Sequence, residues 1–555
     1  MVPPPGERLV RYVGDRLRFT LRLEKGNESS ATKAFLRTNL GRAAALRREI
    51  IESLDAVRPL AGESWRDVPL RFVDGEWIVE FALAEVGFFQ AKAYCVDARG
   101  RQIWTAGDNV GISVHPNHCR TANTIYGAFT RMFGASRSAA VTVDAALEKR
   151  LNEWDHQGYT VIPPSGKFRD LIKVLPHIFD TLGCRILHLL PVNPTPTTYA
   201  RFGRFGSPYA CGDLTAIDPA LAEFDKRATA LDQFCELTEA VRLRGGQVYL
   251  DLVINHTGWG SALQEKHPEW FKREPGGEFA SPGAWGNTWA DLVELEPHHR
   301  ELWEHLAEAF LTWCRRGVSG FRCDAGYKVP MPVWQYITAR VRAEFPDTVF
   351  FLEGLGGGWD DTANLLTQGG MQWAYSELFQ EFNGPQIAGY IDHALKQSAR
   401  VGTLVHYSET HDNDRLAAKG RAWSLLRNRL SALTSVNGAF GFTGGVEWLA
   451  TEKINVHSCR GMNWGNPDNL LPELARLNHL LAEHPCFFDG AQITRLSTND
   501  SSILALLRES AEGRDRVLIL INLDATKPHT LALSSEKFGR HAEIAPATFP
   551  ALTSE

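Results

Sequence analysis

The sequence has no uninterrupted apolar run of about 18 residues, the length that a membrane-spanning helix needs. Residues 1–7 lack a basic stretch followed by an apolar core, so we expect no secretory signal. The nine cysteines form no CxxC pair and have no zinc-like spacing, which argues against a structural zinc site. Scattered thiols are typical of a reducing compartment, and we expect a cytoplasmic protein without membrane association.

A strong charge of one sign is also missing. The chain carries 59 Lys and Arg against 65 Asp and Glu, a net charge of -6, which argues against a nucleic-acid partner. Aromatic residues are plentiful, with 16 Trp, 29 Phe and 12 Tyr. Aromatic faces hold sugar rings but also fill protein cores, and both uses stay open at this point.

Residues 1–118 are predicted to form an N-terminal β-sandwich domain. Residues 17–23 and 77–83 alternate apolar and polar side chains, as half-buried strands do. We interpret residues 31–54 as a helical insertion between strands. The domain would either support its neighbour or bind a glycan.

Residues 119–488 alternate between helical and strand patterns. Helices are predicted at 168–182, where Pro176 should disturb the helix, and at 228–243, 298–316, 332–345 and 417–433. About eight apolar strands are predicted, at 123–129, 185–191, 247–253, 318–324, 348–353, 371–375, 403–407 and 438–442. Repeated βα units favour a closed (β/α)8 TIM barrel, here with an insertion at about 256–298. An open doubly wound sheet is the alternative, and residues 489–555 are predicted to form a small C-terminal β-sandwich domain.

Four of the predicted strands lead into charged or polar side chains. In a barrel these strand ends converge on one face, where active sites are built. Two carboxylates about 5–5.5 Å apart would support retaining glycoside hydrolysis through a covalent glycosyl-enzyme. The strand-end residues are Asp251, Asn255, His256, Arg322, Asp324, Glu353, His411 and Asp412.

Their roles follow from their neighbours in the sequence. Arg322, two residues before Asp324, would keep that carboxylate ionised as a nucleophile. Glu353 has no adjacent cation and suits the proton donor, while Asp412 would bind sugar hydroxyls and raise the pKa of Glu353 by like charge. Each residue alone also has a structural interpretation, such as an ion pair or a helix cap. Their combination in this order favours catalysis.

These segments resemble the four sequence regions of the α-amylase superfamily, glycoside hydrolase family 13. The resemblance covers residues 120–490. It implies that Asp324 is the nucleophile, Glu353 the acid/base and Asp412 the transition-state stabiliser. The loop with Tyr209 and Asp213 resembles the family's loop after the second strand. The supporting and substrate-binding residues that it implies are Arg322, His256, His411, Asp251, Tyr209 and Lys328.

Within that family, residues 206–209, 267–271 and 328–330 and the pair His115-Pro116 resemble bacterial maltosyltransferases that extend α-1,4-glucans from maltose 1-phosphate. The catalytic segment also resembles the glucanotransferase part of debranching enzymes. Gly354 and Thr410 depart from the Ala and Asn that the family usually has there. The resemblance implies transfer of glucosyl or maltosyl units. A cytoplasmic α-glucan hydrolase and a non-catalytic glycan-binding barrel are the alternatives.

The resemblance also raises the question of a metal. Some family members bind calcium near the third-strand insertion, where Asn255 and Asp291 offer oxygens. The sequence has no dedicated calcium loop, so we expect chemistry without a metal or cofactor. The expected partner is an α-glucan or maltooligosaccharide substrate.

Overall fold

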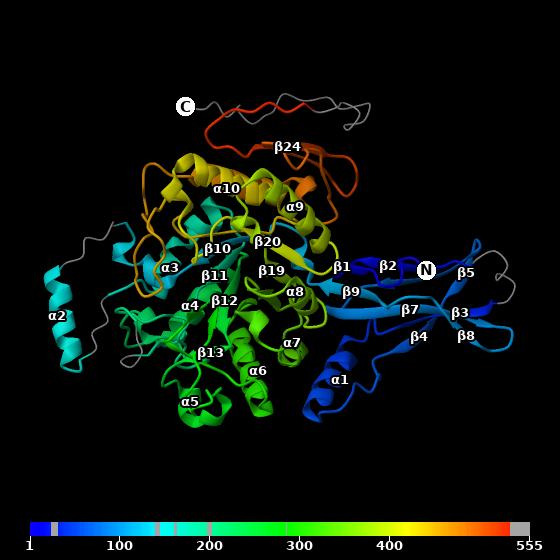
Figure 1. Cartoon of the computed structure of the whole chain (residues 1–555), viewed down its shortest axis with the longest axis horizontal. Coiled ribbons are helices and arrows are strands. Elements are labelled where there is room, and N and C mark those ends of the chain that lie inside the picture. Colours follow the sequence, from blue (N-terminus) through cyan, green and yellow to red (C-terminus); the bar gives the residue numbers. More distant parts are fainter. Residues whose placement is uncertain (24–30, 139–144, 160–163, 197–201, 285, 533–555) are drawn as a thin grey trace.

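The computed structural model describes residues 1–23, 31–138, 145–159, 164–196, 202–284 and 286–532 (Figure 1). At its centre, eight parallel strands close into a barrel, which confirms the predicted (β/α)8 fold and excludes the open sheet. The strands are almost wholly buried, as expected for apolar strands covered on both faces. Around the barrel they are β10 (Thr124–Ala128), β11 (Ile186–Leu189), β12 (Gln247–Val253), β17 (Gly320–Asp324), β18 (Val349–Leu352), β19 (Trp373–Tyr375), β20 (Thr403–Tyr407) and β21 (Phe440–Thr443).

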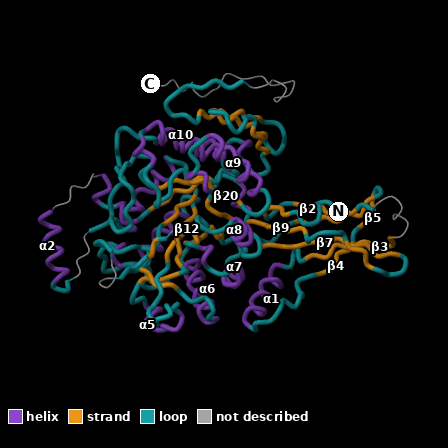
Figure 2. The backbone as a smooth tube through the Cα atoms, in the orientation of Figure 1, coloured by secondary structure: helices purple, strands orange, loops and turns teal. Residues whose placement is uncertain are grey.

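Helices surround this barrel, and Figure 2 shows them as a purple shell around the central orange strands. Their order follows the predicted alternation of strand and helix. They are α3 (Phe168–Leu175), α4 (Ala230–Arg242), α6 (Arg300–Arg315), α7 (Met331–Glu344), α8 (Trp359–Leu366), α9 (Gly384–Ser398), α10 (Arg421–Thr434) and α11 (Leu471–Glu483). A further helix, α2 (Ala145–His156), follows β10. As predicted, Pro176 ends regular α-helix: a π-helical segment, Pro176–Thr181, follows α3 because proline has no backbone N–H to donate.

The N-terminal residues form two facing sheets. One has the order β1-β9-β7-β3-β4 with β8 beside β7, and the other has the order β2-β6-β5. Phe19, Leu36, Phe89 and Ile112 pack between them and are at most 1% exposed. The strands are β1 (Arg8–Tyr12), β2 (Arg16–Leu21), β3 (Ala31–Thr38), β4 (Arg66–Pro69), β5 (Arg71–Val73), β6 (Glu76–Ala82), β7 (Gly87–Asp97), β8 (Gln102–Trp104) and β9 (Val110–His115).

One N-terminal prediction is partly wrong. Residues 31–54 were expected to be a helical insertion, but their first part is strand β3, and only α1 (Ala43–Asp55) is helical. In β3 the alternate residues Ala34, Leu36 and Thr38 are buried between the sheets. Pairing with β7 and β4 on either side therefore decides the conformation of this segment.

The predicted insertion follows β12 and folds as two small antiparallel pairs with one short helix. It contains β13 (His256–Gly258), α5 (Ala262–Lys266), β14 (Gly283–Ala284), β15 (Asn287–Thr288) and β16 (Leu292–Glu294). Strand β13 pairs with β16, and β14 pairs with β15.

After the barrel comes one antiparallel sheet, β22-β23-β24, formed by Gln492–Arg495, Ile503–Glu509 and Arg516–Asn522. It lies against α9 and α10 (Figure 1). The predicted C-terminal β-sandwich also includes residues 533–555, which lie outside the described residues.

A single side chain connects the three regions. Arg120 precedes the barrel, and its Nη2 lies 2.6 Å from Asp15 of the N-terminal region. Its Nη1 lies 2.7 Å from Asp489, beside the C-terminal sheet. The guanidinium carbon also lies 5.0 Å from the ring centroid of Tyr12. Because these partners come from both flanking regions, Arg120 ties them together at the base of the barrel.

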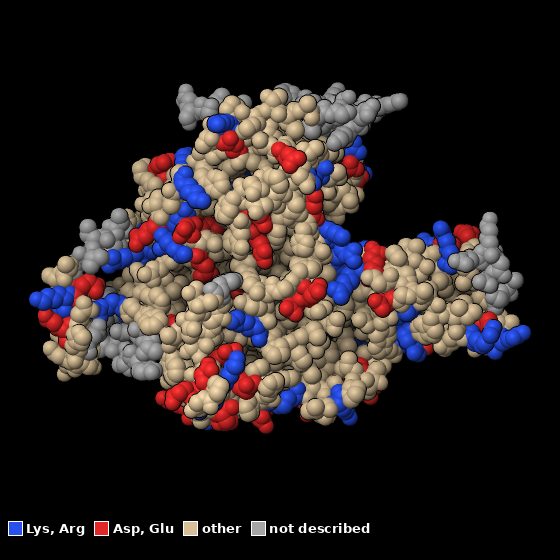
Figure 3. Space-filling model, viewed as in Figure 1, with Lys and Arg blue, Asp and Glu red and all other residues tan. Residues whose placement is uncertain are grey.

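The surface drawn in Figure 3 has basic and acidic side chains intermixed, in keeping with the small net charge. Within the described part of the chain, no helix combines the length and the apolarity needed to cross a bilayer.

Candidate active site

Arg322 is the polar centre of the barrel's carboxyl-end face. In β17 it points to the same side as Asp324, because residues two apart in a strand share a face. Its Nη1 donates to Asp324 Oδ1 at 2.5 Å and to both oxygens of Asp251 at 2.9 and 3.0 Å. Its Nη2 lies 3.9 Å from Glu353 Oε2. One guanidinium therefore contacts three of the carboxylates selected from the sequence.

Glu353 directly follows β18 and is 8% exposed. Its Oε2 accepts a 2.8 Å hydrogen bond from the Ala325 N–H, and its Oε1 accepts one of 2.9 Å from the Leu355 N–H. Burial raises the pKa of Glu353; the Arg322 charge opposes this shift and the Asp324 charge adds to it. The pKa of this group is therefore shifted in the direction that a proton donor needs.

The structure adds two neighbours of Glu353 that the sequence did not indicate. Glu353 was selected partly because no cation adjoins it in the sequence, yet in the barrel Arg322 lies beside it. The parallel register places β17 next to β18 and thus brings the cation to the acid. The like charge of Asp324 raises its pKa, a contribution that was expected from the sequence only for Asp412.

Tyr209 joins two sides of the site. Its hydroxyl donates a 2.8 Å hydrogen bond to Asp251 Oδ2 and lies 2.7 Å from His411 Nε2. The rings of Tyr209 and His411 stack with centroids 5.4 Å apart. Asp251 is fully buried, and burial raises its pKa to about 7. Asp251 is therefore enclosed by Arg322 and Tyr209, and its hydrogen bonds hold these two side chains in position.

Asp412 completes the set from the loop after β20. Its Oδ2 lies 3.3 Å from His411 Nε2, and its side chain is 67% exposed, whereas that of His411 is 3% exposed. Thr410 and Asn413 close the turn, since Asn413 Oδ1 accepts from the Thr410 N–H at 3.0 Å. A continuous series of contacts thus runs from Asp412 through His411 and Tyr209 to Asp251.

The insertion supplies the other wall. His256 was expected in the loop after the third strand but begins β13, because its pairing with Glu294 extends the chain there. Burial lowers its pKa to about 4, so the ring is neutral, and its buried Nε2 has no hydrogen-bond partner among the described residues. Lys328 donates to the Gly283 carbonyl, and its Nζ lies 5.1 Å from the Trp289 ring centroid. His256 therefore offers an unused polar atom, whereas Lys328 anchors the insertion.

Of three other residues considered from the sequence, Asp213 and Asn255 have local partners. Asp213 Oδ1 accepts from the N–H groups of Thr215 and Ala216 at 2.8 and 3.0 Å, so Asp213 closes a turn. The side-chain amide of Asn255 lies 3.4 Å from His256 Nδ1. Burial raises the pKa of Asp291.

Several residues of this network were missed. His188 in β11 has its Nδ1 3.1 Å from the Tyr407 hydroxyl and its Nε2 3.9 Å from Asp251 Oδ2. A lone histidine within the apolar run 185–191 was the available signal. In the loop that holds Asp412, Glu409 and Arg415 form a buried ion pair at 2.6 Å. Glu409 stands in the same polar run as His411, but its partner could be found only in three dimensions.

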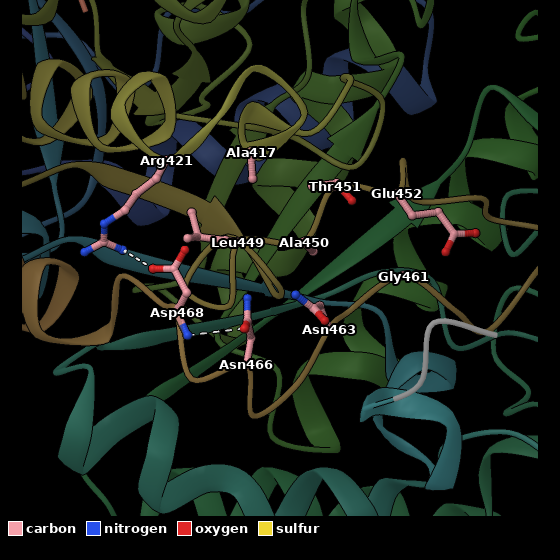
Figure 4. A pocket seen from close by; sticks show the side chains of 10 residues that line it. All are labelled: Ala417, Arg421, Leu449, Ala450, Thr451, Glu452, Gly461, Asn463, Asn466 and Asp468. Atoms are coloured by element: carbon pink, nitrogen blue, oxygen red, sulfur yellow. Dashed lines mark hydrogen bonds and ion pairs between the residues drawn. The ribbon is translucent and has the colours of Figure 1, made fainter.

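A cavity of about 340 Å³ lies beside that loop. Figure 4 shows its side chains, with the Arg421 guanidinium turned to Asp468 and Asn466 next to the Asp468 backbone. Arg415 connects cavity and loop, because its Nε donates to the Glu452 carbonyl at 3.2 Å. The lining residues are Ala417, Arg421, Leu449, Ala450, Thr451, Glu452, Gly461, Asn463, Asn466 and Asp468. They follow β20 and β21 in the chain, so the cavity opens on the carboxyl-end side of the barrel.

Comparison with known proteins gives two kinds of likeness. No protein-family model matches the chain. An alpha-1,4-glucan:maltose-1-phosphate maltosyltransferase of Cereibacter sphaeroides is 25% identical over 391 residues, 66% of this chain and 63% of that protein. The enzyme of the same name from Rhodospirillum rubrum is 26% identical over 510 residues, 83% of this chain and 70% of that protein. The match thus spans less than two thirds of the first relative's length.

Among solved structures, an alpha-amylase from Lactobacillus plantarum superposes with a TM-score of 0.57 at 23% identity. The superposition covers 72% of this chain and 88% of the amylase. At this level of identity the likeness concerns the fold, an α-amylase-type barrel.

Proposed function

We propose that this chain, which is similar in sequence to maltosyltransferases and has an α-amylase-type barrel, is an α-amylase-family enzyme that cleaves α-1,4-glucosidic bonds with retention and transfers the released glucosyl or maltosyl unit to a glucan. The observation that carries the proposal is the position of Arg322. Its two terminal nitrogens lie 2.5 Å from Asp324 and 3.9 Å from Glu353, so one cation adjoins both carboxyl groups that a retaining mechanism uses.

In the first half-reaction, Asp324 attacks the anomeric carbon as a carboxylate while Glu353 gives its proton to the leaving glycosidic oxygen. The carbon–oxygen bond to the leaving glucan breaks as the bond to Asp324 forms. In the second half-reaction, Glu353 takes the proton of an acceptor hydroxyl, which then displaces Asp324. The net stereochemistry at the anomeric carbon is retained.

The other groups bind and position. Asp412, exposed at the opening, would hold sugar hydroxyls as the ring flattens towards the transition state. His256, whose buried Nε2 has no partner, would exchange a hydrogen bond with a hydroxyl of the bound sugar. Asp251 accepts hydrogen bonds from Arg322 and Tyr209 and so positions Arg322, while Tyr209 contacts His411, which lies beside Asp412.

Transfer needs an acceptor held beside the glycosyl-enzyme. The cavity shown in Figure 4 is lined by Thr451, Asn463 and Asn466, and both asparagine amides donate to the Trp448 carbonyl at 3.0 Å. We assign the acceptor glucan to this cavity. Hydrolysis is the second candidate, because the exposure of Asp412 leaves the site open to water.

All nine cysteines are free, and this fits the reducing cytoplasm expected for the protein.

Product analysis tests the proposal. The purified protein is incubated with maltose, maltotetraose, glycogen, and glycogen together with maltose 1-phosphate. Longer chains are the expected result, and they should disappear in Asp324→Asn. Shorter chains alone, with new reducing ends, would replace the transferase by the hydrolase. Unchanged turnover in Asp324→Asn would refute the mechanism altogether.

A further inference from the structure

A second cavity lies far from the carboxyl-end face, between the N-terminal region and the barrel. Its volume is about 260 Å³. On one side is α1 of the N-terminal region, and on the other is α7 of the barrel, which stand side by side in Figure 1. Because the cavity is built by two packed units, its shape is set by their contact.

Two arginines line this cavity, one from each side. Arg342 of α7 is 3% exposed, and its Nη2 donates to Gln372 Oε1 at 2.7 Å and to the Thr348 carbonyl at 3.4 Å. Its buried Nε has no partner within the described part of the chain. Arg47 of α1 donates from its Nη2 to the Val86 carbonyl at 2.8 Å. All these acceptors are neutral.

No carboxylate of the described residues lies within 4.0 Å of either guanidinium, the distance that defines an ion pair. Glu49 also lines the cavity, but its carboxylate accepts from the Ser64 hydroxyl at 2.7 Å and from the N–H groups of Gly62 and Ser64. Glu85 accepts from the Ala43 N–H at the start of α1. The arginine charges are thus left without an anion in contact.

The pKa values of both arginines are lowered, which means that the charged form of each is disfavoured. Burial lowers the pKa of Arg342 to about 9, the charge of Arg47 adds to this shift, and the charge of Asp347 opposes it. Burial also lowers the pKa of Arg47, with Glu85 opposing the shift. A buried cation whose charge is disfavoured by a neighbouring cation is stabilised by a bound anion, which supplies the missing partner.

The remaining wall is apolar. Leu46, Ile50 and Leu54 recur at helical spacing on the cavity face of α1, and Trp65 and Phe88 add aromatic surface. We propose that this cavity binds a small organic anion, with its phosphate or carboxylate group on Arg47 and Arg342 and its apolar body against these side chains. The site is separate from the glucan site and does not depend on the proposed reaction.

Titration calorimetry on the full chain tests this site with three probes. Benzoate and inorganic phosphate carry the two head groups, and benzamide is the uncharged counterpart of benzoate. Binding of at least one anion at concentrations up to about 10 mM is expected, and the preferred anion identifies the head group. Arg47→Gln should weaken it about tenfold or more, because a charge-assisted hydrogen bond is lost. Arg48→Gln, an exposed neighbour on α1, is the matched control and should bind normally.

Arg47→Gln removes one hydrogen bond to a backbone carbonyl and should still fold, which its circular dichroism spectrum verifies. Arg47→Lys keeps the positive charge and should therefore bind the anion more tightly than Arg47→Gln. The proposal is wrong if neither anion binds the natural sequence, if benzamide binds as well as benzoate, or if Arg47→Gln binds as well as Arg48→Gln.

Discussion

The backbone N–H of Ala325 donates a 2.8 Å hydrogen bond to the carboxylate of Glu353. Ala325 directly follows Asp324 and has a φ of 43°, in the left-handed region that residues with a Cβ seldom adopt. The turn that ends β17 therefore directs its N–H at the acid of the neighbouring strand. The positions of the proposed nucleophile and the proposed acid are consequently fixed to each other through the backbone.

The raised pKa of Glu353 gives a pH prediction. The acid form is the active one in the first half-reaction, so kcat/KM should fall as pH rises through the pKa of Glu353, and a raised pKa moves that fall to higher pH. Glu353→Gln should lose turnover of maltooligosaccharides by about a thousandfold or more. It should keep a fast first step on α-maltosyl fluoride, whose leaving group needs no proton. The rate of fluoride release measures this.

The natural sequence should show the alkaline fall with maltotetraose but not in the release of fluoride, because only the glucan leaving group needs the proton of Glu353. An equal alkaline fall with both substrates would show that another group is the acid. Arg315→Gln, an exposed charge change on α6, serves as the control and should keep the natural pH profile.

The hydroxyl of Tyr209 can be removed without changing the ring. Tyr209→Phe leaves Asp251 and His411 each without one contact, so we expect kcat/KM to fall about tenfold to a hundredfold. Steady-state kinetics on maltotetraose gives the value. Tyr159→Phe removes a hydroxyl from a residue that is 66% exposed and should have no effect. Equal kinetics for the two variants would remove Tyr209 from the site.

The proposed acceptor cavity predicts a change in product partition. Asn463→Ala and Asn466→Ala remove amides that hold the cavity wall to the Trp448 carbonyl, so the ratio of transfer to hydrolysis should fall about fivefold to tenfold. The release of fluoride from α-maltosyl fluoride should stay within a factor of about two, since the donor step does not use the cavity. Chromatography of chain lengths gives the ratio, with Asn109→Ala in the N-terminal region as control. An unchanged ratio would place the acceptor elsewhere.

His115 predicts a pH dependence of stability. It is 1% exposed, neither ring nitrogen has a partner among the described residues, and burial lowers its pKa to about 3. Below pH 6.5 the unfolded chain takes up a proton that the folded chain refuses, so stability is lost as pH falls. This residue should account for a loss of about 2 kcal/mol between pH 8 and pH 5.

His115→Leu should lose less stability than the natural sequence over the same interval, as measured by denaturant unfolding at both pH values. His298→Phe, at a position with an 87% exposed side chain, should leave the interval unchanged. Equal pH dependence in His115→Leu and the natural sequence would mean that His115 is protonated in the folded protein.

Much of the barrel was predictable because its strands are short apolar runs whose length and flanking glycines leave little choice. The order of Arg322 and Asp324 within β17 also indicated a shared face, since side chains alternate in a strand. What could not be predicted were contacts between strands. The register of β12 against β17 pairs Asp251 with Arg322, and no local pattern reports it.

The same reason explains the errors. Arg322 reaches Glu353 across neighbouring strands, so no cation adjacent in the sequence indicates this contact. His188 stands in an apolar strand, and only the closed barrel brings it to Tyr407. In the N-terminal region, β3 contains residues that suit a helix, and its two sheet neighbours decided the outcome.

The contacts of Arg120 predict how truncated fragments of the protein will behave. A fragment beginning at residue 119 would lack Asp15 and Tyr12, and one ending at residue 488 would lack Asp489. Either fragment would leave this guanidinium short of partners at an uncovered surface. Recombinant pieces that follow the apparent boundaries should therefore express poorly, and crystallisation or deletion work is better served by the intact polypeptide.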